Sequence, residues 1–146
     1  MARISVEVER IVAGPPERVL DLLADYADTR GQLWPDMITD YKVVEGGVGA
    51  GTRITYRLHA TRKRVRDVDA VVSAPKAGTL LESDQNSSLR VQWTVRAAGA
   101  GGSTVSAHTT WDGAGGIGGF FEKTFAPIGI RRLNSGVLDS LEARLR

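Results

Sequence analysis

The sequence predicts an α+β fold in which a curved antiparallel sheet of about seven strands wraps around a long C-terminal helix. Two observations predict it. Segments that alternate apolar and polar residues fill much of the chain up to Trp111, and the block Ile117–Arg146 carries apolar residues at helical spacing. Short turns join the alternating segments, which is typical of an antiparallel meander. Wrapping the sheet around the helix buries the apolar face of both and leaves a cavity between them.

The first third of the chain predicts one strand followed by two short helices. The strand covers residues 4–12, where apolar side chains alternate with polar ones. A Gly-Pro-Pro stretch ends it, and Pro16 suits the first turn of a helix. Helical spacing of apolar residues then predicts an amphipathic helix over Glu17–Tyr26. A second short helix or turn is expected over Asp28–Leu33, before the Trp34–Pro35 pair breaks the pattern.

Six further strands are expected before the C-terminal block. The glycine-rich stretch Gly46–Gly51 predicts a hairpin turn, and Leu89–Ala97 shows the clearest alternation. The expected strands are Tyr41–Val44, Thr52–Ala60, Arg64–Ser73, Thr79–Ser83, Leu89–Ala97 and Ser103–Trp111. The helical block that follows contains Pro127, which predicts a kink or a break between two helical pieces. Without a linker or repeat, residues 1–146 are expected to form a single domain.

The composition argues against several classes of protein. The 146 residues include no cysteine, which removes disulfides, thiolate nucleophiles and cysteine metal sites. A net charge of +2 gives no reason to expect a nucleic-acid partner, and no histidine–carboxylate cluster has metal-ligand spacing. The N-terminus lacks the apolar core of a signal peptide, and no apolar run is long enough to span a membrane. We therefore expect a cytoplasmic protein without a metal and without stable membrane insertion.

Three glycines, Gly113, Gly115 and Gly118, match the G-x-G-x-x-G spacing of dinucleotide-binding loops. Such a loop belongs to a βαβ unit, in which a second parallel strand follows the helix. The residues after Gly119 instead predict helix to the end of the chain, so we expect no nucleotide and no other cofactor. We interpret the glycines as a flexible joint that lets the last helix move while a ligand passes.

A series of weak motifs follows one order along the chain. The first strand closes with AGPPERVLDLLADY, LWP precedes the second strand, and GVGAGT forms the first long hairpin. A strand that ends in Trp-Asp, the glycine-rich loop, and a last helix with a phenylalanine pair and an internal proline come later. Together they resemble the START-like, helix-grip (SRPBCC) superfamily, and within it the polyketide cyclase/dehydrase and lipid-transport group. The resemblance implies an apolar pocket for a lipid, sterol, quinone or polyketide, but no single reaction.

The aromatic residues favour a ligand cavity on the inner side of the sheet. Trp and Tyr carry polar groups that need partners when buried, which suits a pocket that holds a mostly apolar ligand at one or two points. The alternative is that these side chains only fill the core. The expected ligand-binding residues are Trp34, Met37, Ile54, Tyr56, Leu58, Trp93, Thr109, Trp111, Phe121 and Phe125. We expect a non-catalytic carrier of a hydrophobic small molecule, either a monomer or a homodimer.

A polyketide aromatase/cyclase is the alternative function. Such an enzyme needs a shaped pocket and one or two groups that position an enol and move a proton. Tyr56, Arg66 and His59 are the acid/base candidates, although no catalytic motif is matched and the catalytic residues remain unknown. His59 and His108 fall on the polar positions of their strands, which predicts exposed side chains.

The run Thr61–Asp69 is the strongest charge feature. Arg62, Arg64 and Arg66 share one strand parity, and Arg53 and Arg57 could lie beside them. One interpretation is a basic face that makes transient contact with membrane headgroups or an acidic acyl-carrier protein, in the extreme an interaction module with a vestigial cavity. The favoured one is a solvated outer face, which an inward arginine would overturn. The acidic residues expected to balance it are Asp67, Asp69, Glu82 and Asp84.

Overall fold

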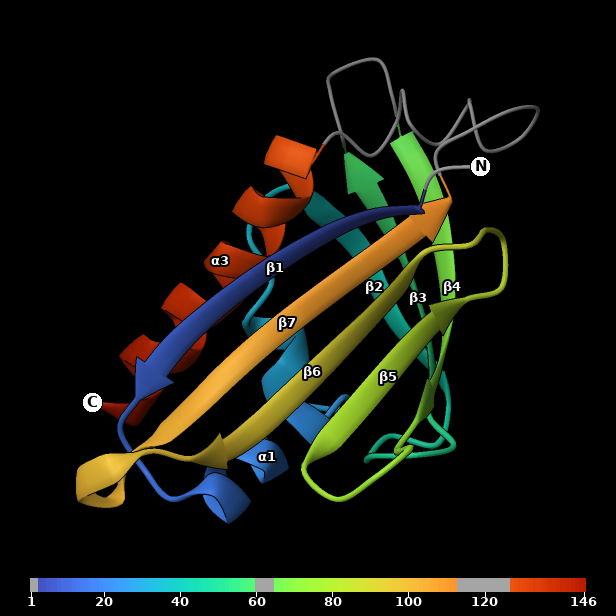
Figure 1. Ribbon diagram of the computed structural model, residues 1–146. Helices are drawn as coiled ribbons and strands as arrows, with labels where there is room; N and C mark the ends of the chain where they lie inside the picture. The colour runs from blue at the N-terminus through green and yellow to red at the C-terminus, as the bar shows by residue number, and fades with distance from the viewer. Residues whose placement is uncertain (1–2, 60–64, 113–126) are drawn as a thin grey trace.

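The computed structural model describes residues 3–59, 65–112 and 127–146, and within them seven strands form one curved antiparallel sheet (Figure 1). The strand order is β1-β7-β6-β5-β4-β3-β2, so the first two strands of the chain form the two edges. The strands are β1 (Arg3–Val12), β2 (Ile38–Glu45), β3 (Arg53–His59), β4 (Val65–Ser73), β5 (Thr79–Asp84), β6 (Arg90–Ala97) and β7 (Ser103–Asp112). The predicted sheet is confirmed.

The alternation that predicted the strands sorts their side chains between two faces. In β6, Val91, Trp93 and Val95 are buried, whereas Arg90 and Arg96 are exposed. Successive side chains of a strand point to opposite faces, so one face of the sheet lies on the core and the other faces solvent. We call these the inner and the outer face.

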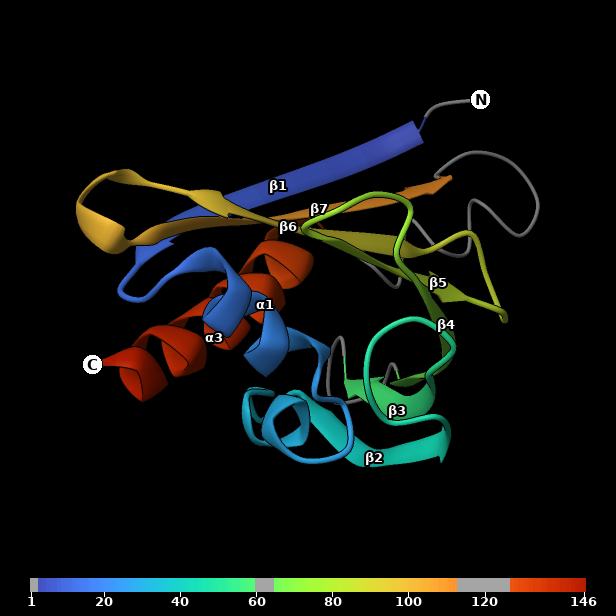
Figure 2. The ribbon, with the colours of Figure 1, turned by 90° about the horizontal axis from the view of Figure 1, so that it is seen from below.

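The helices lie on the inner face (Figure 2). Helix α1 (Pro16–Ala24) begins one residue before the expected start at Glu17, with Pro16 in its first turn, and ends two residues before Tyr26. The second short helix is a single 3₁₀ turn, η1 (Thr29–Gln32), and another turn, η2 (Gly99–Gly101), joins β6 to β7. The C-terminal helix α3 (Pro127–Leu145) begins at Pro127. The preceding part of the expected helix, with Phe121 and Phe125, lies outside the described residues, as does the glycine fingerprint.

Helix α3 packs under β1 and β7 (Figure 2). Its buried side chains are Ile130, Leu133, Asn134, Val137, Leu138 and Leu141. Gly136 allows the segment between η1 and β2 to approach closely, because a Cβ atom there would lie 3.0 Å from the Pro35 ring. Arg10 of β1 reaches across to Glu142 of the helix at 3.2 Å. The LWP motif is therefore held between α3 and the sheet.

Candidate ligand-binding site

The inner face gathers most of the predicted ligand-binding residues. Trp34 and Met37 are half-buried and pack against the core from the segment that follows η1. The Trp34 ring lies 4.9 Å from the Tyr56 ring and 5.9 Å from the Tyr41 ring, measured between centroids. The predicted residues buried on the sheet itself are Ile54, Tyr56, Leu58, Trp93, Thr109 and Trp111. Aromatic rings thus converge where β3 faces the η1 segment.

An ion pair lies at the centre of this aromatic group. Arg30 of η1 is fully buried, and its Nη2 lies 2.8 Å from Oε2 of Glu82, which projects from the inner face of β5. The geometry is that of a close ion pair rather than an aligned hydrogen bond, because Nη2 lacks an aligned acceptor. The Tyr26 hydroxyl donates to the same Oε2 at 2.6 Å, and Arg30 Nη1 donates to the Leu23 carbonyl at 3.0 Å.

Three aromatic rings surround the Arg30 guanidinium. Its Cζ lies 5.0 Å from the ring centroid of Tyr26, 5.2 Å from that of Trp34 and 4.9 Å from that of Trp93. An arginine in this position is held by the negative faces of the rings as well as by Glu82. We call Tyr26, Arg30, Trp34, Glu82 and Trp93 the arginine cage.

Burial and neighbouring charges shift the pKa values of Arg30, Tyr26 and the adjacent Tyr56. Burial alone would lower the pKa of Arg30, but the charge of Glu82 raises it, and the net shift is upward. Burial raises the pKa of Tyr26 well above its ordinary value, and Glu82 raises it further. Burial and the charges of Glu82 and Asp84 likewise raise the pKa of Tyr56. The guanidinium therefore stays charged and the phenols stay protonated at neutral pH.

Several buried donors around the cage have no hydrogen-bond acceptor among the described residues. They are the indole N–H groups of Trp34 and Trp93 and the Nε and Nη2 groups of Arg30. The Tyr56 hydroxyl likewise makes no hydrogen bond to a described residue. The carboxylate of Glu82, in contrast, is already shared by Arg30 and Tyr26. The unsatisfied groups on this part of the inner face are therefore donors.

Thr109 is engaged within the core. Its Oγ1 accepts a hydrogen bond of 2.7 Å from the Asn134 side chain of α3, and both residues are buried. This contact ties α3 to β7. The Thr109 hydroxyl, which the sequence predicted as a ligand contact, therefore already has a hydrogen-bond partner within the protein.

The structure separates the three acid/base candidates. Arg66 lies on the inner parity of β4 with the buried Val68, and Leu58 is its cross-strand partner. Tyr56 pairs with Val68, so the backbones of Tyr56 and Arg66 are diagonal neighbours, roughly 7–8 Å apart. His59 lies on the outer parity of β3, where Nε2 is 2.7 Å from the Thr39 hydroxyl. Only Tyr56 and Arg66 therefore share a face.

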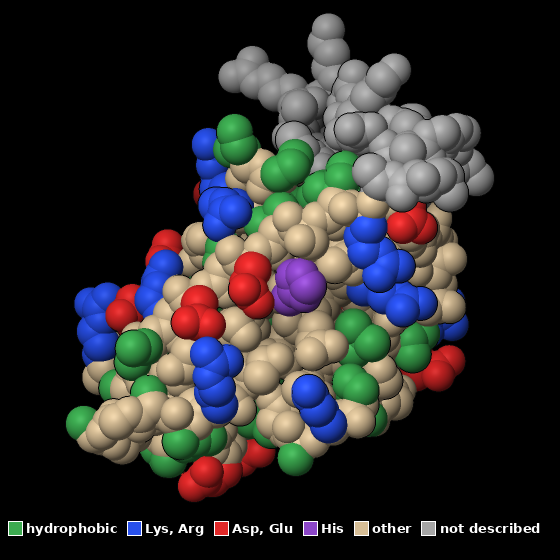
Figure 3. Space-filling model, viewed as in Figure 1, with side chains coloured by type: hydrophobic (Ala, Val, Ile, Leu, Met, Phe, Trp, Pro, Cys, Tyr) green, Lys and Arg blue, Asp and Glu red, His purple; other side chains and the backbone are tan. Residues whose placement is uncertain are grey.

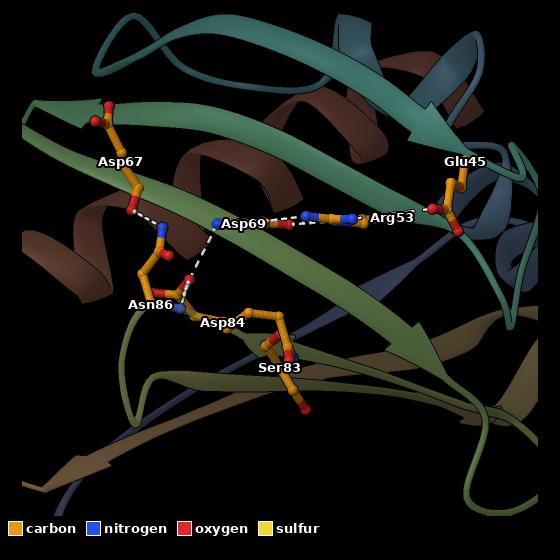
Figure 4. A network of polar contacts seen from close by, with 8 residues as sticks. Glu45, Arg53, Asp67, Asp69, Ser83, Asp84 and Asn86 are labelled. Carbon is orange, nitrogen blue, oxygen red and sulfur yellow. Dashed lines mark hydrogen bonds and ion pairs between the residues drawn. The ribbon is translucent and has the colours of Figure 1, made fainter.

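Arginine–aspartate pairs lie on the outer face, as expected, but not all of the residues expected there belong to them. Arg53 makes two hydrogen bonds to Asp69, of 2.8 and 2.7 Å, and their contact lowers the pKa of Asp69 (Figure 4). Arg57 lies 3.4 Å from Asp67. Three expectations were wrong: Arg66 lies on the inner face, Glu82 lies in the cage, and Asp84 is buried and accepts backbone hydrogen bonds (Figure 4). Arg62 and Arg64 lie outside the described residues.

Sequence reasoning missed Arg30, Glu82 and Asn134. Glu82 shares the parity of the buried Leu80, and that alternation could have placed it inward. Asn134 lies three, four and seven residues before Val137, Leu138 and Leu141, so it belongs to the buried stripe of the last helix. Arg30 stands in the polar stretch TRGQ, which carries no such signal.

A curved antiparallel sheet with a helix along its inner face is the helix-grip arrangement. The family model for polyketide cyclase / dehydrase and lipid transport matches residues 3–146, and the chain belongs to this family. A comparison with curated protein sequences finds no match. The KanY protein, solved by NMR in solution, is 45% identical over 99% of both chains, with a TM-score of 0.88.

Two more distant structures share the fold. The Zhui aromatase/cyclase from Streptomyces sp. R1128 is 16% identical, with 99% of this chain and 97% of that chain covered and a TM-score of 0.70. A START superfamily protein from Mycobacterium smegmatis is 12% identical, with 98% and 96% covered and a TM-score of 0.68. In the part of the chain that the structure describes, no helix combines the length and the apolar character needed to cross a bilayer.

Proposed function

We propose that the inner face beside the arginine cage binds a hydrophobic small molecule that carries carbonyl-type oxygen atoms. The observation that carries the proposal is the buried indole N–H of Trp93, which has no acceptor among the described residues although the side chain is 1% exposed. An unsatisfied buried donor costs about 1–3 kcal/mol, and a ligand acceptor would recover that free energy. Membership of a family that includes lipid transport and polyketide cyclases supports the ligand class.

The other groups of the site favour the same chemistry. Aromatic rings supply apolar contact area, and burial of ligand surface contributes roughly 25 cal/mol per Å² before ordering costs. The Tyr56 hydroxyl and the Trp34 indole add donors without acceptors among the described residues. A quinone or a polyketone fits this pattern, because its oxygens accept hydrogen bonds while its skeleton remains apolar. A pure hydrocarbon would leave every donor unsatisfied.

A matched pair of probes tests the proposal. We expect 2-methyl-1,4-naphthoquinone to bind more tightly than 2-methylnaphthalene by roughly tenfold, measured by NMR titration of the labelled protein. Trp93→Phe and Tyr56→Phe remove one donor each and should reduce that preference. Tyr41→Phe is the control, because its hydroxyl already donates to the Tyr26 carbonyl at 2.7 Å. Equal affinity for both probes in the unsubstituted protein would rule the proposal out.

A polyketide aromatase/cyclase is the second candidate, and the shared face of Tyr56 and Arg66 favours it. A protonated phenol and a guanidinium on neighbouring strands could polarise a carbonyl and protonate an enolate. Tyr56→Phe and Arg66→Ala should each slow cyclisation of a model poly-β-ketone, whereas His59→Ala on the outer face should not. Unchanged rates in both inner-face variants would exclude this mechanism.

A further inference from the structure

A row of polar side chains crosses the outer face where β5, β6, β7 and β1 lie side by side. The register pairs Ser83 with Arg90, Arg90 with Thr110, and Thr110 with Ser5. Directly paired residues of antiparallel strands project from the same face, so Arg90 lies between hydroxyl side chains on both sides. A hollow of about 300 Å³ at this row is lined by Ser83, Arg90, Thr110 and the neighbouring Arg3, among others. We call it the Arg90 hollow.

Arg90 is the cation of this hollow that has no ion-pair partner among the described residues, although the two arginines and two carboxylates of the lining leave no net formal charge. Arg90 makes no ion pair within the described part of the chain. Two carboxylates also line the hollow. Asp84 already accepts hydrogen bonds from two backbone N–H groups and from the Ser87 hydroxyl, and Asp112 lies 3.8 Å from Arg3. Figure 3 shows basic side chains on this face beside the end of β7, with an acidic side chain next to them.

We propose that the Arg90 hollow binds a phosphate group. A guanidinium donates through a planar fork, and a phosphate has enough acceptor oxygens to meet that fork and still accept from the hydroxyls of Ser83 and Thr110. A carboxylate has only two oxygens, and both would accept from the guanidinium, which leaves none for the hydroxyls. Arg90, Ser83 and Thr110 lie on the opposite face of the sheet from the arginine cage, so this site goes beyond the proposed function and does not depend on it.

NMR titration of the labelled protein with inorganic phosphate tests the proposal, with sodium chloride at equal ionic strength as the reference. We expect saturable shifts of the amide signals of Ser83, Arg90 and Thr110. Arg90→Gln should weaken phosphate binding by about tenfold or more, because charge-assisted hydrogen bonds are lost. Arg96→Gln is the matched control: Arg96 lies on the same strand and face but is paired with Glu9 at 3.1 Å. Its affinity for phosphate should stay within about twofold of the unsubstituted protein.

Vesicles distinguish the two sources of a phosphate group. Sedimentation with vesicles of phosphatidic acid in phosphatidylcholine, compared with phosphatidylcholine alone, identifies a lipid headgroup if Arg90→Gln abolishes the difference. Saturable binding of inorganic phosphate without vesicle binding identifies a free phosphate or a soluble phosphate ester. Shifts that sodium chloride reproduces, or phosphate binding that Arg90→Gln leaves unchanged, would overturn the proposal.

Discussion

Replacement of Glu82 by glutamine removes the negative charge that balances the Arg30 guanidinium in the arginine cage. Glu82 is 4% exposed and its partner Arg30 is fully buried, so Glu82→Gln leaves a guanidinium in the core without a counter-charge from the described residues. Breaking a buried pair in this way costs about 3–5 kcal/mol. Domains of this kind are stable by about 5–15 kcal/mol, so the loss is a large fraction of the total.

Urea unfolding followed by circular dichroism measures this loss. With an m-value of about 2 kcal/mol per molar, the midpoint should fall by roughly 2 M. Glu9→Gln is the control, because its pair with Arg96 at 3.1 Å is about half exposed on both sides and should contribute less than about 1 kcal/mol. Adding Arg30→Met to Glu82→Gln removes the orphaned charge and should recover most of the loss.

Two results would refute the reasoning. One is a midpoint for Glu82→Gln no lower than that of Glu9→Gln, which would mean that the guanidinium is compensated by the rings alone. The other is a double variant, Arg30→Met with Glu82→Gln, that is as unstable as the single one. In that case the loss would come from packing around Glu82 rather than from unpaired charge.

Three further predictions concern backbone and titration. In α3, Gly129→Ala should stabilise the protein by up to about 1 kcal/mol, because a Cβ atom there meets open space. Gly136→Ala should destabilise the protein, because its Cβ atom would displace Pro35. The urea unfolding midpoints of the two variants test both expectations. Ala100→Gly should raise the melting temperature, because residue 100 has a φ of 60°; a lower value would contradict this. The three tyrosines, Tyr26, Tyr41 and Tyr56, have raised pKa values in the folded state. Above about pH 10 the folded state therefore holds more protons than the unfolded state, so the free energy of unfolding should fall as the pH rises further. Tyrosinate absorbance should rise together with loss of circular dichroism; titration near pH 10 in the folded protein would contradict the burial argument.

The sheet could be predicted from the sequence because strand alternation is a local signal. Leu89–Ala97, for example, shows the inward Trp93 directly in its pattern. The arginine cage could not be predicted, since Arg30 and Glu82 meet only through the order of strands and the path of the η1 segment. The same limit misplaced Arg66, whose charge argued for the outer face while its parity with Val68 sets it on the inner one. Residue type predicts exposure well for isolated charged side chains and poorly for charged side chains that pair with another residue in the folded protein.

The pairing of β1 with β7 has a consequence for synthesis on the ribosome. Ile4 meets Trp111 and Ile11 meets Thr104, so the first strand has no partner until the seventh has been made. At about 5–20 residues per second, translation of the chain between them takes roughly 5–20 s. Throughout that interval the nascent β1 presents an unpaired backbone and an apolar row, which is a template for aggregation. We therefore expect a ribosome-associated chaperone to hold the first strand longer than any other part of the chain. A circular permutant that joins the original termini and opens the chain after β1 is translated with β1 last, behind β7 and α3, and should shorten that dependence.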